Sequence, residues 1–239
     1  MSFRKLLCMT IVGGLAFGVA NAQDKKPEVP KKEDVKKAIE DAAKKVGDDK
    51  KTHEGGMSAE EKAMMDAMMA LGQPGDNHKL LEPMVGEWTY TTKFWMDPSA
   101  PPSESTGNSS VKSLMGGRYF VGEHKGKFEM PGPDGKPVPM DFHGIATNGY
   151  DNNTKKFVST WIDNMSTMIM TFEGTYDPAT KAFTYTGTMP DCMSPGKNVS
   201  VREVIRILDK NKHVMEWYET RDGKEMKSME ITYTRKQSS

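Results

Sequence analysis

Residues 198–235 read NVSVREVIRILDKNKHVMEWYETRDGKEMKSMEITYTR, and this stretch decides the fold class. Apolar and polar residues alternate in three runs, as they do in β-strands that have one buried face. The runs cover about 198–209, 213–221 and 225–235. Gly223, between the last two runs, permits the positive φ of a tight hairpin. The stretch therefore predicts three antiparallel strands joined by short turns.

The same pattern extends towards the N-terminus as far as Trp88. Apart from Phe3 and Phe17, every aromatic residue lies between Trp88 and Tyr233. Further alternating runs, divided by turn residues, cover about 87–96, 106–114, 118–129, 140–149, 156–163, 166–176 and 182–189. About ten strands without an intervening helix predict an all-β, antiparallel up-and-down meander. Closure into a barrel removes its exposed edges and is the first prediction, with a β-sandwich as the alternative.

Period-two alternation assigns the side chains of a strand to two faces. The residues predicted to share a face are Phe157, Trp161 and Asp163 on one strand, Met168, Met170, Phe172 and Tyr176 on the next, and Met229, Ile231, Tyr233 and Arg235 on the last. The alternation alone leaves open which face lines the lumen.

Residues 1–22 have the three parts of a secretory signal peptide. Arg4 and Lys5 precede an apolar run, Leu6–Val19, and the small-residue site Ala20–Ala22 follows it. The run is shorter than the ~20 residues that a helix needs to span a bilayer. We therefore expect cleavage after Ala22, export to the periplasm or the extracellular space, and no membrane span in the mature chain.

Two segments precede the predicted barrel domain, 76–239. Residues 23–57 are rich in charge and lack aromatic residues, which predicts a disordered linker. Residues 58–75 predict an amphipathic helical segment, with the helix itself at 59–71 after a capping box that begins at Ser58. Its methionines, Met64, Met65, Met68 and Met69, form a stripe that predicts packing against the barrel, and copper binding is the weaker alternative.

The charge balance argues against a nucleic-acid partner. The chain has 33 basic and 33 acidic residues, so no basic surface is indicated. Cys192 is the single cysteine after the signal peptide, which excludes a disulfide within the mature chain.

Gly86, Glu87 and Trp88 open the first predicted strand, and Arg235 ends the last. This arrangement resembles the calycin superfamily. The resemblance implies that Gly86, Trp88 and Arg235 are structural, with the guanidinium stacked on the indole to close one barrel end.

A longer pattern is similar to the bacterial DUF1579 family over about 76–236. Its elements are His78–Leu81, Gly86–Trp88, Gly116–Arg118, Gly144, Gly149–Asp151, Trp161–Asp163 and Tyr233–Arg235. The resemblance implies a single-domain protein without an assigned activity, so it supports the fold more than any function.

The sequence contains no nucleophile elbow, phosphate loop or HExxH motif, and it indicates no cofactor. A binding module is therefore favoured over an enzyme. The first hypothesis is a small, largely apolar ligand in the lumen. Trp161 would supply apolar contact and Tyr150 a polar-tipped ring, while Asp163 and His143 would orient the ligand.

Two alternatives stay open. The first is an interaction module with a filled barrel. The second is a hydrolase or isomerase that uses an inward carboxylate from Asp163, Glu173, Glu203 or Glu216. For these carboxylates, pairing with Arg202 or Arg206 is the expected arrangement.

Overall fold

The computed structural model describes residues 58–237 apart from 133, 135, 192–193 and 195. The predicted signal peptide, the predicted linker over 23–57 and Cys192 lie outside the described residues. The chain divides into two units, and the unit that holds the barrel includes residues 71–239.

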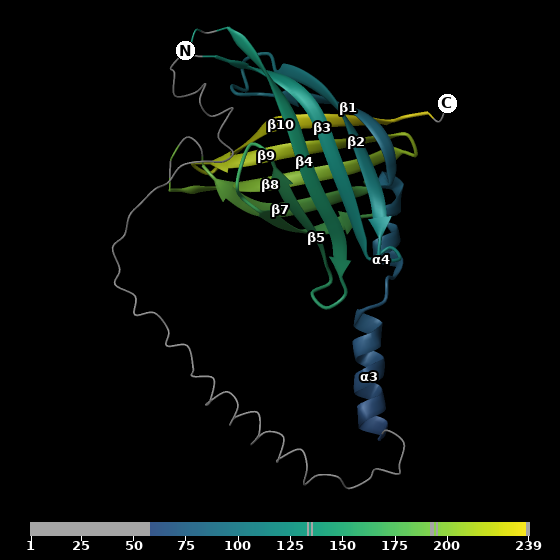
Figure 1. Ribbon diagram of the computed structural model, residues 1–239. Coiled ribbons are helices and arrows are strands. Elements are labelled where there is room, and N and C mark those ends of the chain that lie inside the picture. Colours follow the sequence, from purple (N-terminus) through teal and green to yellow (C-terminus); the bar gives the residue numbers. More distant parts are fainter. Residues whose placement is uncertain (1–57, 133, 135, 192–193, 195, 238–239) are drawn as a thin grey trace, which may run out of the picture. The chain divides into compact units, whose positions relative to one another are not determined.

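Ten antiparallel strands form a closed barrel in the described part of the chain (Figure 1). In chain order they are β1 (Gly86–Phe94), β2 (Ser103–Leu114), β3 (Tyr119–Pro131), β4 (Pro137–Asp151), β5 (Lys156–Asp163), β6 (Met170–Asp177), β7 (Ala182–Pro190), β8 (Asn198–Asp209), β9 (Lys212–Arg221) and β10 (Lys224–Arg235). Each strand pairs with its neighbours in sequence, and β1 pairs with β10. The predicted up-and-down barrel is confirmed and the sandwich alternative is wrong, because all ten strands belong to one closed sheet.

The alternation of burial identifies the inner face. On β1, Trp88 and Tyr90 are buried whereas Thr89 and Thr91 are exposed. Residues directly opposite each other in an antiparallel pair share a face, and Trp88 lies opposite Arg235 while Tyr90 lies opposite Tyr233. The predicted set on the last strand therefore faces the lumen.

The sixth strand begins later than predicted, at Met170 instead of about 166. The residues between Asp163 and Met170 form a loop, because side chains of this segment accept hydrogen bonds from its backbone N–H groups. The Met165 N–H donates to Asp163 Oδ1 at 2.9 Å, and the Met168 N–H donates to Ser166 Oγ at 3.3 Å. These bonds replace ladder bonds to β5.

A short segment closes one end of the barrel. It contains the helix α4 (Asp76–Lys79) and the 3-10 turn η2 (Glu82–Met84). Leu81 is fully buried and Met84 is buried, and both belong to the main hydrophobic cluster. The Trp88 indole Nε1–H donates to the Met84 carbonyl at 2.9 Å, which ties this segment to β1.

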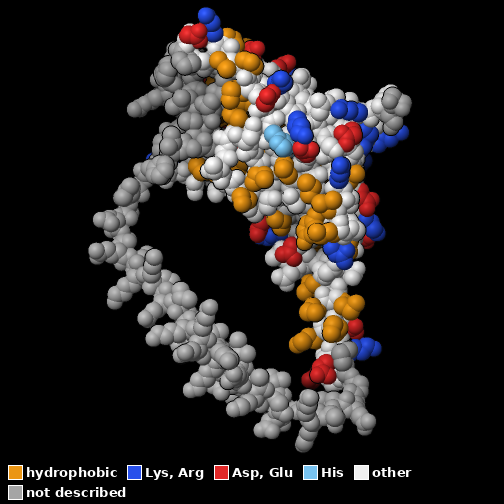
Figure 2. Space-filling view, viewed as in Figure 1, with side chains coloured by type: hydrophobic (Ala, Val, Ile, Leu, Met, Phe, Trp, Pro, Cys, Tyr) orange, Lys and Arg blue, Asp and Glu red, His pale blue; other side chains and the backbone are white. Residues whose placement is uncertain are grey.

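The predicted helix is present as α3 (Ala59–Leu71), and its capping box forms as expected. The Ser58 N–H donates to Glu61 Oε2, and the Glu61 N–H donates to Ser58 Oγ. None of its residues is buried, and Met64 is 75 % exposed. Hydrophobic side chains lie uncovered along this helix in Figure 2. No other described element belongs to the unit that holds residues 59–70, so the packing expected of the methionine stripe stays a prediction.

Candidate functional site in the barrel lumen

Arg235 closes the end of the barrel where β1 begins. Its guanidinium carbon lies 4.0 Å from the centre of the Trp88 ring. The same side chain donates to three carbonyl oxygens, those of Lys210, Val85 and Pro83, at 2.7, 2.7 and 2.8 Å. Gly86 makes room for it, because a Cβ at this position would lie 2.1 Å from Arg235 Nη1. Each of the three guanidinium nitrogens at this end of the barrel therefore donates to a protein carbonyl.

Glycines on the inner face allow aromatic rings to lie against the wall. A Cβ at Gly144 would lie 2.3 Å from Trp161 Cζ2, and a Cβ at Gly107 would lie 2.3 Å from Tyr90 Cζ. Each ring thus covers the backbone of a neighbouring strand. A ring that lies along the wall occupies less of the lumen than a ring that points at the barrel axis.

Two of the four predicted ligand-binding residues come together on the inner face. Trp161 and Asp163 both face the lumen on β5, and Trp161 Nε1–H donates to Asp163 Oδ2 at 2.7 Å. The Trp161 ring also lies 5.3 Å from the imidazole of His124. Asp163 is therefore already bonded to the indole and to the loop, so it holds Trp161 in place.

The other two predicted residues lie elsewhere. Tyr150 faces inwards, but it contacts His78 and Phe157 with ring centres 5.7 and 4.9 Å apart. Tyr150 lies four residues along β4 from Ala146, the residue paired with Trp161. At 3.3 Å per residue this separation is ~13 Å. His143 faces outwards, and its Nε2 lies 2.9 Å from Glu123 Oε1. It precedes Gly144, which faces the lumen, so alternation places His143 on the outer face and outside the proposed site.

Glu203 is the site residue that the sequence reasoning failed to single out. It lies on β8 directly opposite Tyr185 of β7 and Trp217 of β9. Its neighbours on the same face, Val201 and Ile205, pack in the core. Within the described residues the carboxylate forms no ion pair or hydrogen bond, and burial raises its pKa to about 7.

The expected pairing of the strand carboxylates with Arg202 or Arg206 holds for Glu216 only, and Glu173 pairs with a lysine instead. Glu216 pairs with Arg206, and Glu173 pairs with Lys156. For Glu203 the expectation is wrong, because positions one or three residues away in a strand point to the opposite face. Arg202 accordingly binds Glu225 through two bonds of 2.7 and 2.6 Å.

The inner face retains surface that water can reach. Glu203, His124, Trp161 and Trp217 all face the inside of a closed wall, yet each is only partly buried. Water can reach an inward side chain of a closed barrel only through its lumen. These four residues are therefore not completely covered by their neighbours on the inner face.

Two histidines and two tyrosines of the inner face are held neutral. Burial lowers the pKa of His124 to about 4, and burial together with the Arg235 charge lowers that of His213 to about 3. Burial also raises the pKa of Tyr185 and of Tyr233, and Glu203 raises both further. The buried Ser109 Oγ, Tyr185 hydroxyl and His213 Nδ1 lack hydrogen-bond partners among the described residues. The lumen thus combines aromatic walls with a small number of unpaired polar atoms.

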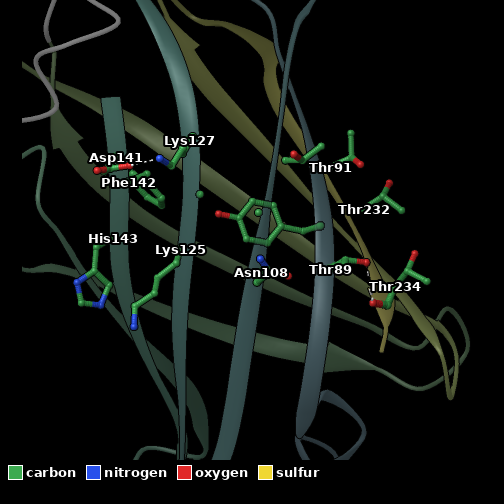
Figure 3. Close-up of a pocket in the computed structure, with 14 residues that line it drawn as sticks. Thr89, Thr91, Asn108, Lys125, Lys127, Asp141, Phe142, His143, Thr232 and Thr234 are labelled. Carbon is green, nitrogen blue, oxygen red and sulfur yellow. Dashed lines mark hydrogen bonds and ion pairs between the residues drawn. The ribbon is translucent and has the colours of Figure 1, made fainter. Parts of the chain in front are cut away.

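An open groove of about 810 Å³ lies on the opposite side of the wall, across β10, β1, β2, β3 and β4 (Figure 3). Threonines line one side of it, and Lys125, Lys127 and His143 line the other. Lys127 pairs with Asp141 at 3.3 Å, and Lys125 pairs with Glu123 at 2.7 Å. Since its charged groups already have partners, the groove is the weaker candidate site.

The described part of the chain contains neither of two other features, a metal-binding cluster or a membrane-spanning helix. No group of three or more His, Cys, Asp or Glu side chains is arranged there to hold a metal ion. No helix there is long and apolar enough to cross a membrane.

Comparison with known proteins gives a family match over the whole barrel. The family model described as "Protein of unknown function (DUF1579)" matches residues 73–235, which contain the whole barrel. The chain belongs to the DUF1579 family. No curated protein matches this DUF1579 chain. Solved structures similar to it include that of Rv2717c from M. tuberculosis, which is 14% identical over 69% of this chain and 100% of its own, with a TM-score of 0.48. Another is a protein of unknown function from the DUF3598 family of Nostoc punctiforme, which is 6% identical over 68% of this chain and 100% of its own, with a TM-score of 0.23.

Proposed function

We propose that this DUF1579 barrel is a binding protein that holds a small, largely apolar ligand in its lumen. The observation that carries the proposal is the environment of Glu203. This carboxyl faces the lumen without an ion-pair or hydrogen-bond partner among the described residues, and part of its surface is accessible. A buried polar group without a partner costs free energy, so a ligand that completes its bonding would be favoured.

The surrounding walls suit an apolar body. Trp217 and Tyr185 flank Glu203, and Trp161 lies flat on β4. Aromatic side chains supply large contact areas at small cost in conformational entropy, and ligand sites commonly combine such walls with few polar groups.

A fluorescent probe tests the proposal. N-phenyl-1-naphthylamine is a neutral aromatic compound whose emission rises in apolar sites, and we expect saturable binding of one molecule per barrel. Ala146→Phe adds a ring on the inner face, opposite Trp161. This should weaken binding by ~10-fold or more, the equivalent of ~1.4 kcal/mol.

Ile145→Phe is the matched control, because it adds a similar ring on the outer face of the same strand. It should leave affinity within about twofold, which is a few tenths of a kcal/mol. Thermal unfolding of each variant shows that the barrel is intact, and Ala146→Leu replaces the phenylalanine variant if that one fails to fold. Equal affinities for the inner and outer variants would show that the probe binds outside the lumen.

The exposed methionines of α3 favour a second candidate, an interaction module with a filled barrel. Met64 and Met68 are 75 % and 65 % exposed, and no residue of this helix is buried. If the folded protein binds no probe in the titration above, the interaction module would become the favoured candidate.

Export is part of the proposal and rests on residues 1–22. Small residues at Ala20 and Ala22 follow an apolar run of secretory length, so signal peptidase is expected to cut after Ala22. N-terminal sequencing of the protein from the exported fraction should begin at Gln23. Exported protein that still begins at Met1 would contradict this prediction.

A further inference from the structure

We infer that the ligand of the lumen carries a positively charged ammonium group and that Glu203 binds this group. The inference rests on the lumen binding proposed above and specifies the chemistry of the ligand. It depends on how charges are distributed over the inner face and on which rings surround the carboxylate.

Among the described residues, the inner face offers Glu203 no free cation. Arg235 is inward, but its guanidinium is bonded to three carbonyls and stacked on Trp88. Arg221, at the other end of the barrel, binds Glu219 and Asp191. The basic side chains next to Glu203 in sequence, Arg202 and Arg206, bind partners on the outer face. The negative charge of Glu203 therefore lacks a neighbouring protein cation, and a cationic ligand would neutralise it.

Aromatic rings on three strands surround this carboxylate. Tyr185 and Trp217 lie directly opposite it on β7 and β9. Tyr233 on β10 is near enough for the Glu203 charge to raise its pKa. Ring faces carry negative potential and attract ammonium groups, most strongly where water is scarce. A carboxylate together with aromatic rings selects a cation over a neutral or anionic group of the same size.

The titratable groups that face Glu203 predict how binding depends on pH. They are Tyr185 on β7, His213 and Glu219 on β9, Tyr233 on β10 and His124 on β3, and Asp163 on β5 and Tyr90 on β1 face the same lumen. His124 and His213, with pKa values of about 4 and about 3, stay neutral above about pH 5.5, and the three tyrosines stay neutral at basic pH. Glu219 accepts bonds from Ser228 and Arg221, and Asp163 accepts bonds from Trp161 and Met165. Glu203, with a pKa of about 7, is then the group whose titration changes the affinity for a cation in this range.

Three probes of equal shape test the inference: naphthalen-2-ylmethylammonium, naphthalen-2-ylmethanol and naphthalene-2-carboxylate. Titration calorimetry near pH 8 should give the ammonium an affinity at least ~10-fold above that of the alcohol, with the carboxylate weakest. Between about pH 5.5 and pH 8 the ammonium affinity should rise by up to ~30-fold, because the ionised fraction of Glu203 rises by that factor. The alcohol affinity should stay constant.

Glu203→Gln removes the charge and keeps the shape. It should lower the ammonium affinity by ~10-fold or more near pH 8 and leave the alcohol within about threefold. Glu173→Gln is the matched control, since Glu173 lies on the outer face and pairs with Lys156. This variant should bind all three probes as the natural chain does.

Two outcomes would contradict the inference, and they are distinguishable. Alcohol that binds as tightly as ammonium, with neither affected by Glu203→Gln, would overturn the ammonium assignment and leave lumen binding in place. Failure of all three probes to bind folded protein would overturn lumen binding itself, and the ammonium assignment with it.

Discussion

Trp88→Ala is expected to lower the free energy of unfolding by ~3–5 kcal/mol, as large-to-small changes of buried aromatic residues do. The Trp88 ring is 1 % exposed and belongs to a buried cluster with Tyr90, Met215 and Tyr233. His213 packs edge-on against it at 4.4 Å. The change removes these contacts and leaves the Met84 carbonyl without its indole donor. Urea unfolding followed by circular dichroism measures the loss.

Trp95→Ala provides the comparison at the other end of β1. Trp95 is only partly buried, and its ring is contacted by Lys227 at 5.4 Å. Its loss should cost ~1 kcal/mol or less. Equal costs at the two positions would show that Trp88 has no special part in closing the barrel.

The contact between Trp88 and Arg235 can be measured separately from the cavity. A double-mutant cycle with Trp88→Phe and Arg235→Met should show coupling of ~0.5–2 kcal/mol, the range of cation–π contacts. The pair is 4.0 Å apart although β1 and β10 lie at opposite ends of the domain in sequence. Additive effects would indicate that the three carbonyl bonds of Arg235 hold it without help from the ring.

The sequence predicted the barrel well because its signals are local. Alternation determines which side chains share a face of each strand, and the turn residues at 209–212 and 221–224 determine where the hairpins form. Period two alone places Met229, Ile231 and Tyr233 on one face, and the burial of Tyr233 identifies that face as the inner one. Closure between β1 and β10 is not local, and it was predicted from the exposed edges that so long a meander would leave and from the resemblance carried by Gly86, Trp88 and Arg235.

The site was harder to predict because it depends on contacts between strands that are distant in sequence. The pairing of Glu203 with Arg202 or Arg206 assumed that neighbours in sequence meet, whereas a strand sends them to opposite faces. The signal that could have identified Glu203 was present, since Val201, Glu203, Ile205 and Ile207 share one face. The same alternation places His143 and Gly144 on opposite faces of β4. The methionine stripe of α3 shows the converse limit, because a helical stripe does not identify the surface against which it packs.

Glu203→Gln is expected to stabilise the protein at basic pH and to have little effect at acidic pH. The pKa of Glu203 rises from its ordinary value of 4.5 to about 7 on folding, because burial disfavours the charged form. Below about pH 4.5 the carboxyl is protonated in both the folded and the unfolded state, so it adds no electrostatic cost. Between these two pKa values it ionises only in the unfolded chain, and stability falls as pH rises. Above about pH 7 the full cost is present.

The difference between the two pKa values corresponds to ~3 kcal/mol, and water in the lumen reduces the expected gain to ~2–3 kcal/mol. Urea unfolding of both proteins between about pH 4.5 and pH 8.5 measures it as a growing difference in the free energy of unfolding. Because the inward histidines have lowered pKa values, the folded protein becomes less stable as pH falls below ~6.5. This loss is common to both proteins and cancels in the difference. Glu173→Gln, on the outer face, should differ from the natural chain by less than ~0.5 kcal/mol at every pH. A constant difference for Glu203→Gln would mean that the carboxyl is solvated as in water, and the closed, poorly hydrated surroundings on which its ligand binding depends would then be absent.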